Sequence, residues 1–243
     1  MNVKAVYIHI PKTGGTSFKK VFEPFINDHI VTEQSKIIKY QKNYYRNELS
    51  VINFEISNAL RNKEALGDEV WKNAFKFTLV RNPWDRYVSN WKWLTRKERL
   101  FPKKGWHARG WQGMDGQITF ENFVKQIQAC YYELTPWHLY WHDKWHIRNQ
   151  IEHIVDNNDN IIVDYIGRFE NIENEYSFIR KKIGLDNLEL PHLNHDGHYS
   201  GEEKTHDVKK IHYSNYYNDE LIDIVYERCK QDILTFNYDF ERQ

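Results

Sequence analysis

The chain has 243 residues and a mass of 29.6 kDa, and 40% of its residues are hydrophobic, which suffices for one well-packed α/β domain. It carries 34 basic and 34 acidic residues, and this zero net charge argues against a dedicated nucleic-acid-binding protein, because such domains are usually strongly basic. Its two cysteines, Cys130 and Cys229, are too few for a disulfide framework and lack metal-ligand spacing, so we expect two buried thiols.

The first predicted elements are a strand, a loop and a helix. The run VKAVYIHI is rich in β-branched and aromatic residues, which is typical of a buried strand, and SFKKVFEPF has apolar spacing compatible with a helix. Between them, Gly14 and Gly15 permit backbone angles that other residues avoid, so successive N–H groups can point inward. We expect Thr16 or Ser17 to cap the helix.

The loop PKTGGTS, residues 11–17, has the composition of an anion-binding site. A helix N-terminus offers N–H donors and a partial positive charge, and Lys12 adds a full charge. Further donors come from the hydroxyls of Thr13, Thr16 and Ser17. An ordinary glycine turn in a βα unit is the alternative, but the lysine and the hydroxyl cluster favour a site for phosphate or sulfate.

Two familiar nucleotide-binding loops do not fit this segment. A nucleotide triphosphatase loop, G-x-x-x-x-G-K-[ST], places its lysine after the last glycine, whereas Lys12 precedes both Gly14 and Gly15, and no glycine occupies the earlier position. The dinucleotide pattern G-x-G-x-x-G is also absent from the loop. The expected ligand is therefore a phosphate or sulfate group presented in another way.

A second strand, turn and helix are predicted in FKFTLVRNPWDRYVSNW, residues 75–91. The strand runs into Arg81, the chain turns at the following Asn-Pro, and a helix continues from there. Arg81 at the end of the strand and Ser89 about two turns into the helix can then converge on one anion. Taken singly, Arg86 could equally pair with a carboxylate, and Ser89 could be an ordinary surface residue of the helix.

Both segments resemble motifs of the sulfotransferases that use 3′-phosphoadenosine 5′-phosphosulfate (PAPS). PKTGGTS is similar to the loop that holds the 5′-phosphosulfate, especially in the carbohydrate and Golgi-type branch and its bacterial relatives. RNPWDRYVS matches the 3′-phosphate motif R-[DN]-P-x-x-R-x-x-S at every fixed position. The resemblance implies that the donor is bound by Pro11, Lys12, Thr13, Gly14, Gly15, Thr16, Ser17, Arg81 and Ser89.

The remaining predicted elements agree with that family. Residues 160–185 are expected to form a strand, a turn at Gly167 and a helix, and residues 216–240 resemble the family's usual closing helix. IEHIV and NIIVDYIG, separated by the turn-rich DNNDN, are expected to add a hairpin. The expected fold is one sulfotransferase domain over residues 1–243, an α/β, P-loop-like fold with a central parallel sheet flanked by helices on both faces.

The resemblance implies in-line sulfuryl transfer, in which an acceptor oxygen attacks sulfur and Lys12 stabilises the departing phosphate. No metal is required. The acceptor hydroxyl also needs a base, which is normally a His or Glu in this family. His29, between the two motifs, is the first candidate, Glu55 is the second and His107 is the third. A surface position for His29 is an equally good interpretation of the sequence alone.

The stretch WHLYWHDKWH offers a metal-binding alternative. His138, His142 and His146 recur every four residues and would share one helical face. Tryptophans recur at the same spacing, and Asp143 alone does not complete a convincing metal set, so we rank packing first, acceptor binding second and metal third. The nine tryptophans of the chain favour a carbohydrate acceptor, because flat aromatic faces suit sugar rings.

The sequence contains no apolar run near the ~20 residues that a bilayer span needs, and no signal peptide, so we expect a cytoplasmic protein. Residues 92–109 carry seven Lys or Arg against one Glu, an excess that could meet an anionic donor or acceptor, or form a solvated surface. The expected partners are PAPS, its product 3′-phosphoadenosine 5′-phosphate (PAP) and a hydroxyl acceptor, without nucleic acid.

Three functions stay open on the sequence. The first is a PAPS-dependent sulfotransferase acting on a carbohydrate hydroxyl, which predicts binding of PAP. The second is a nucleotide-dependent kinase or hydrolase on a related phosphate-loop fold, which predicts magnesium-dependent binding of ATP or GTP. The third is a non-catalytic nucleotide-binding module. The intact set of Lys12, Arg81 and Ser89 argues against the third, and the two motifs together favour the first.

Overall fold

A computed structural model describes seven segments of the chain: residues 3–15, 17–18, 50–54, 58–94, 119–125, 146–185 and 211–243. The chain divides into two compact units. The first contains residues 1–80 and 150–208, and the second contains residues 81–149 and 209–243. The single domain expected over the whole chain stays a prediction.

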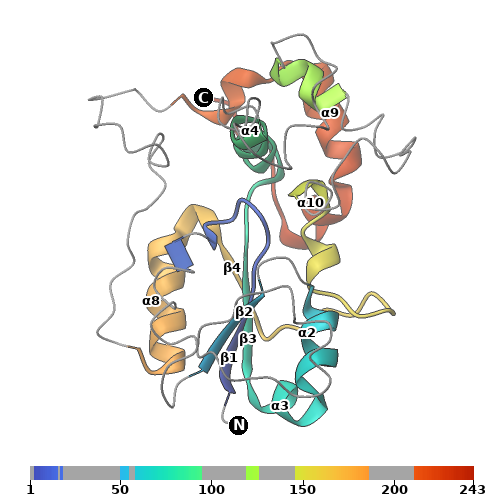
Figure 1. Ribbon diagram of the computed structural model, residues 1–243. Coiled ribbons are helices and arrows are strands. Elements are labelled where there is room, and N and C mark those ends of the chain that lie inside the picture. The colour runs from blue at the N-terminus through green and yellow to red at the C-terminus, as the bar shows by residue number, and fades with distance from the viewer. Residues whose placement is uncertain are drawn as a thin grey trace, which may run out of the picture. The chain divides into compact units, whose positions relative to one another are not determined.

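The first unit is built on a four-stranded parallel sheet with the strand order β2-β1-β3-β4 (Figure 1). The strands are β1 (Val3–Ile8), β2 (Ser50–Phe54), β3 (Phe75–Val80) and β4 (Tyr165–Arg168). In β1 and β3, every residue but Lys4 and Phe75 is buried, which is usual for inner strands of a parallel sheet. The parallel sheet predicted from the sequence is confirmed.

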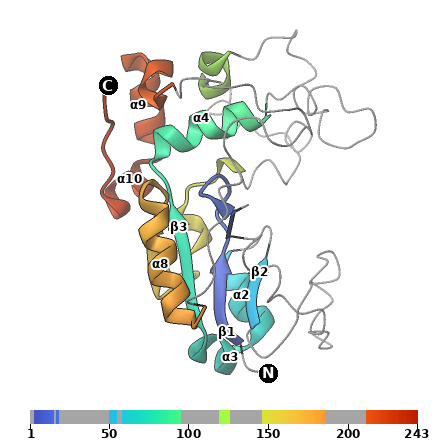
Figure 2. The same cartoon turned by 90° about the vertical axis from the view of Figure 1, so that its left-hand side faces the viewer.

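Helix α8 (Ile172–Ile183) covers one face of this sheet (Figure 2). Alternate residues of the two central strands point toward it, as the period of two in a strand requires. The resulting core consists of Ala5, Tyr7, Phe18, Phe77, Leu79, Tyr176, Ile179, Ile183 and Leu185. Its aromatic rings are in direct contact: the centroids of Tyr7 and Phe77 are 5.2 Å apart, and Phe18 meets Tyr176 edge-on at 5.6 Å.

Helices α2 (Ala59–Leu66) and α3 (Asp68–Asn73) lie on the opposite face. There the buried Lys76 of β3 places its ammonium group 5.7 Å from the ring centre of Trp71 and 2.9 Å from the carboxylate of Asp164. A cation at this depth needs such partners, because burial without them costs several kcal/mol. Helices on both faces of the sheet, as predicted, are thus confirmed.

The predicted turn at Gly167 is wrong, because this glycine lies inside β4 and pairs with Leu79 of β3. A Cβ atom at Gly167 would come within 2.7 Å of Leu79 Cδ2 and 2.8 Å of Glu175 Oε2. The glycine therefore serves close packing between the strand and α8. The chain turns later, in the short helix η4 (Phe169–Asn171) that leads into α8.

The hairpin expected around DNNDN is reduced to one antiparallel bridge, between Val155 and Ile161. The segment IEHIV begins as the 3-10 helix η3 (Ile151–His153), so it is not a strand. The turn itself is closed by Asp156, whose carboxylate accepts hydrogen bonds from the N–H groups of Asn158 and Asn160 at 2.8 and 3.0 Å. These side-chain hydrogen bonds stabilise the turn in place of the backbone hydrogen bonds that two longer strands would form.

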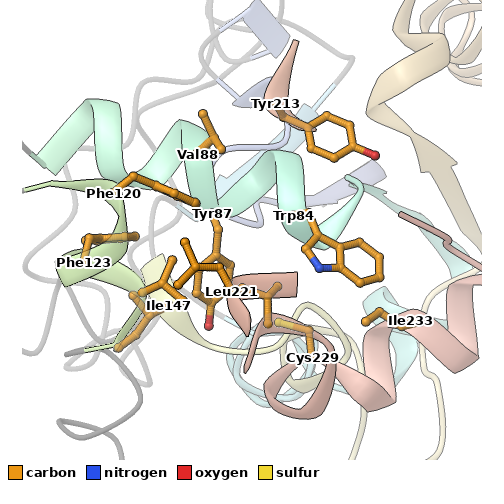
Figure 3. Packing of buried hydrophobic residues seen from close by; sticks show 12 residues of the cluster. Trp84, Tyr87, Val88, Phe120, Phe123, Ile147, Tyr213, Leu221, Cys229 and Ile233 are labelled. Carbon is orange, nitrogen blue, oxygen red and sulfur yellow. The ribbon is translucent and has the colours of Figure 1, made fainter. Parts of the chain in front are cut away.

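The second unit is helical, with α4 (Pro83–Leu94), η5 (Tyr213–Tyr216), α9 (Asp219–Arg228) and α10 (Lys230–Phe236). Its core is rich in aromatic residues (Figure 3). The core residues are Trp84, Tyr87, Val88, Phe120, Phe123, Val124, Ile147, Tyr213, Leu221, Val225, Cys229 and Ile233. The closing helix predicted within residues 216–240 is present as two helices that meet at Cys229.

Cys229 is a free, buried thiol, as predicted for it, and burial raises its pKa to about 12. Cys130 lies outside the described residues. A thiol with so high a pKa is almost entirely protonated at neutral pH and is a poor nucleophile. Cys229 therefore acts as a small hydrophobic residue of the core.

Within the described ranges, none of the helices is long and apolar enough to cross a membrane. The longest of them, α4 and α8, have 12 residues each, whereas a span needs about 20. Both also carry charged residues, among them Asp85 and Lys92 in α4 and Glu173 and Arg180 in α8.

The close packing at Gly167 predicts that Gly167→Ala lowers the free energy of unfolding by roughly 1 to 3 kcal/mol, the usual cost of forcing a methyl group into a filled space. Urea denaturation followed by circular dichroism measures this loss. Lys181→Ala, which changes an exposed residue of α8, is the control and should leave the midpoint near that of the wild type. An unchanged midpoint for Gly167→Ala would contradict the packing described here.

Candidate functional site

Two residues separate the end of β1 from the predicted anion loop, which thus lies at the carboxyl end of this strand, where ligands bind in open parallel sheets. Two of its residues are left-handed: Lys12 has φ of 70° and Gly14 has φ of 87°. For a lysine this conformation is uncommon and costs free energy, so the surrounding structure must hold it in place. In such sharply curved loops, neighbouring N–H groups can converge on one anion.

A helix begins at Gly15, immediately after the curved part of the loop. The carbonyl of Gly14 accepts hydrogen bonds from the N–H groups of Ser17 at 3.1 Å and Phe18 at 3.4 Å. Gly14 is therefore the N-cap. Ser17, one of the two predicted caps, lies inside the helix, and Thr16, the other, lies outside the described residues. Phe18 is fully buried in the core of the first unit, which anchors the start of the helix.

Thr13 is fully buried, and its hydroxyl donates to the carbonyl of Ile10 at 2.8 Å. The hydroxyl that we expected to serve the anion thus closes the loop on itself. A similar hydrogen bond holds the end of β1, where the hydroxyl of Thr78 in β3 donates to the carbonyl of Ile8 at 2.7 Å. Together these bonds fix the path of the chain into the loop.

The two glycines of the loop are needed for space. A Cβ atom on Gly14 would lie 2.7 Å from Ile172 Cδ1 and 3.1 Å from Phe169 Cδ2, and one on Gly15 would lie 1.9 Å from His9 Nε2. The loop is therefore packed between the start of α8 and the imidazole of His9. Sequence reasoning missed His9, although its place between a predicted strand and the anion loop could have drawn attention to it.

The second predicted motif has the expected strand, turn and helix. β3 ends at Val80 and α4 begins at Pro83. Asn82 is buried, and its Oδ1 accepts a hydrogen bond from the N–H of Trp84 at 3.1 Å, so it caps α4. Proline suits the first helical position because its φ is already helical and its missing N–H would have no helical partner there.

Arg81 is held by Asp85, one turn further on. Its Nε and Nη2 atoms each lie 2.8 Å from Asp85 Oδ2, and the two side chains are 13% and 26% exposed. A guanidinium carries five N–H donors in one plane, so Arg81 can bind a phosphate while Asp85 fixes its orientation. Ser89 lies half-buried on α4. These two residues belong to the second unit, and residues 11–17 belong to the first.

Arg86, the second arginine of the motif, has a different environment. It is 1% exposed, and it donates to the carbonyls of Arg148 at 2.8 Å and His146 at 3.0 Å. Asn90 donates to the same His146 carbonyl at 2.9 Å. These hydrogen bonds of Arg86 go to backbone oxygens, and they anchor the segment around His146 to α4.

His146 is the one member of the predicted histidine face within the described residues, and its ring stacks on Trp93 with centroids 4.1 Å apart. In the part of the chain that the structure describes, three or more His, Cys, Asp or Glu side chains nowhere gather as a metal site would require. Several candidates lie outside the described residues, namely Thr16, His29, Glu55, His107, His138 and His142. The assignment of the base stays a prediction.

Comparisons with known proteins place these motifs in context. A model of the sulfotransferase family matches residues 2–239. Among solved structures, the crystal structure of mouse sulfotransferase SULT7A1 complexed with PAP is similar at 14% identity, with 99% of this chain and 68% of that chain covered and a TM-score of 0.33. No curated protein matches the sequence. The family match runs through both compact units.

The contact between His9 and Gly15 predicts strong coupling between the two positions. Gly15→Ala should lower the free energy of unfolding by roughly 1 to 3 kcal/mol, because the new methyl group meets the imidazole. In the double variant with His9→Ala the ring is gone, so the Gly15→Ala change should cost much less. Urea denaturation of the four proteins gives a coupling free energy, expected at about 1 to 3 kcal/mol. Additive effects would show that the two side chains do not compete for one space.

Proposed function

This chain belongs to the sulfotransferase family, and we propose that it transfers the sulfuryl group of PAPS to a hydroxyl group of a carbohydrate or glycoconjugate. The observation that carries the proposal is the loop after β1, where a left-handed lysine and a left-handed glycine precede the start of a helix. That arrangement presents positive charge and N–H donors to one anion. A phosphosulfate is such an anion.

The reaction places specific demands on this loop. The acceptor oxygen attacks sulfur, the bond from sulfur to the bridging oxygen breaks, and the 5′-phosphate of PAP takes the bonding electron pair. Negative charge therefore grows on the bridging oxygen, which lies within the group that the loop binds. Lys12 and the N–H groups of residues 13–15 would stabilise that charge, and their prior orientation is what makes them effective. Because the loop supplies this positive charge, the proposed reaction uses no metal ion.

Selectivity for a 3′-phosphate is assigned to Arg81 and Ser89. Asp85 holds the guanidinium from one side at 2.8 Å, so that the planar donor set is oriented before a ligand arrives. Arginine suits phosphate because it can form two parallel N–H···O bonds. A kinase or hydrolase is disfavoured, because Lys12 precedes the glycines and the loop lacks the nucleotide triphosphatase pattern.

The proposed acceptor is a carbohydrate, and aromatic side chains support this choice. Trp91, Trp93 and Tyr216 are half-buried, and the rings of Trp91 and Tyr216 lie 5.5 Å apart. The ammonium of Lys92 lies 5.2 Å from the Tyr216 ring centre. Partly exposed rings of this kind offer flat apolar surface beside polar groups, which suits the mixed surface of a sugar. Transfer of labelled sulfate to glycans compared with small phenols tests this part.

The role of Lys12 is tested by Lys12→Ala. Its contact with the bridging oxygen should strengthen as charge develops, so the loss should fall on kcat, by about 100-fold or more, while the Kd of PAP changes far less. Single-turnover rates with labelled PAPS and calorimetric PAP binding give the two numbers. Lys4→Ala, an exposed lysine of β1, is the control. Equal turnover in Lys12→Ala and wild type would remove this residue from the mechanism.

The base is tested by the pH dependence of His29→Ala. If His29 takes the acceptor proton, the wild-type rate at saturating PAPS should rise with pH through an ionisation near ~6.5, since the neutral imidazole is the active form. His29→Ala should lose that limb and roughly 100- to 10,000-fold in rate, with PAP affinity unchanged.

Glu55→Gln is the paired variant. Loss of the rate and of the pH limb in Glu55→Gln, with both retained in His29→Ala, would identify Glu55 as the base and show that the first choice is wrong. Retention in both variants would move the assignment to the segment that contains His107.

A further inference from the structure

In the second unit, residues 239–241, which we call the clasp segment, are bound to the turn that precedes α4. The Nδ2 of Asn82 donates to the carbonyl of Asp239 at 3.0 Å. The hydroxyl of Tyr213 accepts the N–H of Glu241 at 2.8 Å and lies 3.4 Å from the same Asn82 Nδ2. Asn82 and Tyr213 are both buried, so leaving their polar groups without these partners would be costly.

Phe240, at the centre of the clasp segment, completes an aromatic cluster. Its ring meets Trp84, Tyr213 and Tyr217 edge-on, with centroid distances of 5.5, 5.6 and 5.4 Å. Edge-on aromatic pairs at such distances contribute beyond the area they bury. The Tyr217 hydroxyl donates to the carbonyl of Trp84 at 2.8 Å. The clasp segment is thus joined to the first turn of α4 by packing as well as by hydrogen bonds.

Asn82 connects the clasp segment to the proposed phosphate-binding residues. Its Oδ1 caps α4, and its Nδ2 holds Asp239, so one side chain fixes both the helix start and the clasp segment. Aspartate, which the motif R-[DN]-P also allows, could cap the helix but has no N–H to donate to the Asp239 carbonyl. Of the two residues, only asparagine can both cap α4 and hold the clasp segment.

Arg81 and Asp85 lie on either side of this turn in sequence and are paired at 2.8 Å. The charge of Asp85 is close enough to Tyr213 to add to the rise that burial causes in the pKa of its phenol. Arg81 also directly precedes Asn82, whose side chain holds the clasp segment. A shift of Asn82 or of the first turn of α4 would move the guanidinium.

We propose that the clasp segment is a positioning element for the 3′-phosphate site. By holding Asn82 and the first turn of α4, it fixes the direction of the Arg81 guanidinium and so sets the preference for nucleotides with a 3′-phosphate. This inference rests on the proposed function, because it takes Arg81 as the residue that binds that phosphate. None of the clasp residues is required to touch the nucleotide.

The test compares the Kd of PAP with that of adenosine 5′-monophosphate, measured by calorimetry. Phe240→Ala removes the packing, and Tyr213→Phe removes the hydroxyl alone and keeps the ring. In both variants we expect the preference for PAP to fall by roughly 3- to 10-fold, as for a charge-assisted contact that is weakened but not removed. The Kd of adenosine 5′-monophosphate should change less than about 2-fold, because it lacks the 3′-phosphate.

Arg242→Ala is the control from the adjoining residue. Its ion pair with Asp219 joins side chains that are 72% and 84% exposed, and such pairs contribute little, so its preference should equal that of the wild type. If the clasp segment only stabilises the fold, Phe240→Ala should have a lower melting temperature and an unchanged preference for PAP. An unchanged preference in both Phe240→Ala and Tyr213→Phe would overturn the proposed positioning role. A wild type without preference for PAP overturns the proposed 3′-phosphate site and the clasp together.

Discussion

Close packing at the loop after β1 is the constraint on which the rest of the first unit depends. Gly14 lies against Ile172 and Phe169, and Gly15 lies against His9, at distances that leave no room for a side chain on either glycine. These contacts hold Lys12 in a left-handed conformation that it would rarely adopt alone. A loop held in this way is ordered before any ligand arrives, so binding an anion costs little further ordering.

The fixed residues of the motif R-[DN]-P-x-x-R-x-x-S have different roles in the structure. Asn82 caps α4 and holds Asp239, and Arg86 is buried on two backbone carbonyls. Arg81, by contrast, is partly exposed and oriented by a carboxylate, which suits a residue that meets a ligand. The motif thus combines a structural arginine, Arg86, with one that we propose for binding, Arg81, and sequence similarity alone does not separate the two.

Much of the fold could be predicted because its signals are local. The apolar runs of β1 and β3, and the Asn-Pro at the start of α4, lie within a few residues of what they specify. The errors arose where the path of the folded chain, and not the order of its residues, decides which groups meet. Gly167 is required by Leu79 and Glu175, and no neighbour in sequence reveals this. The hydroxyl of Thr13 bonds to Ile10 because the loop curves back, and His9 matters because it occupies the space beside Gly15.

Recognition of a 3′-phosphate by Arg81 is the central claim about this protein. Calorimetric titration of the wild type and Arg81→Ala with PAP, adenosine 5′-monophosphate and ATP plus magnesium tests it. The wild type should bind PAP about 10- to 100-fold more tightly than adenosine 5′-monophosphate, because one charge-assisted contact typically contributes that much to affinity. Arg81→Ala should lose that preference. Tighter binding of ATP with magnesium than of PAP would contradict the account and favour a kinase or hydrolase.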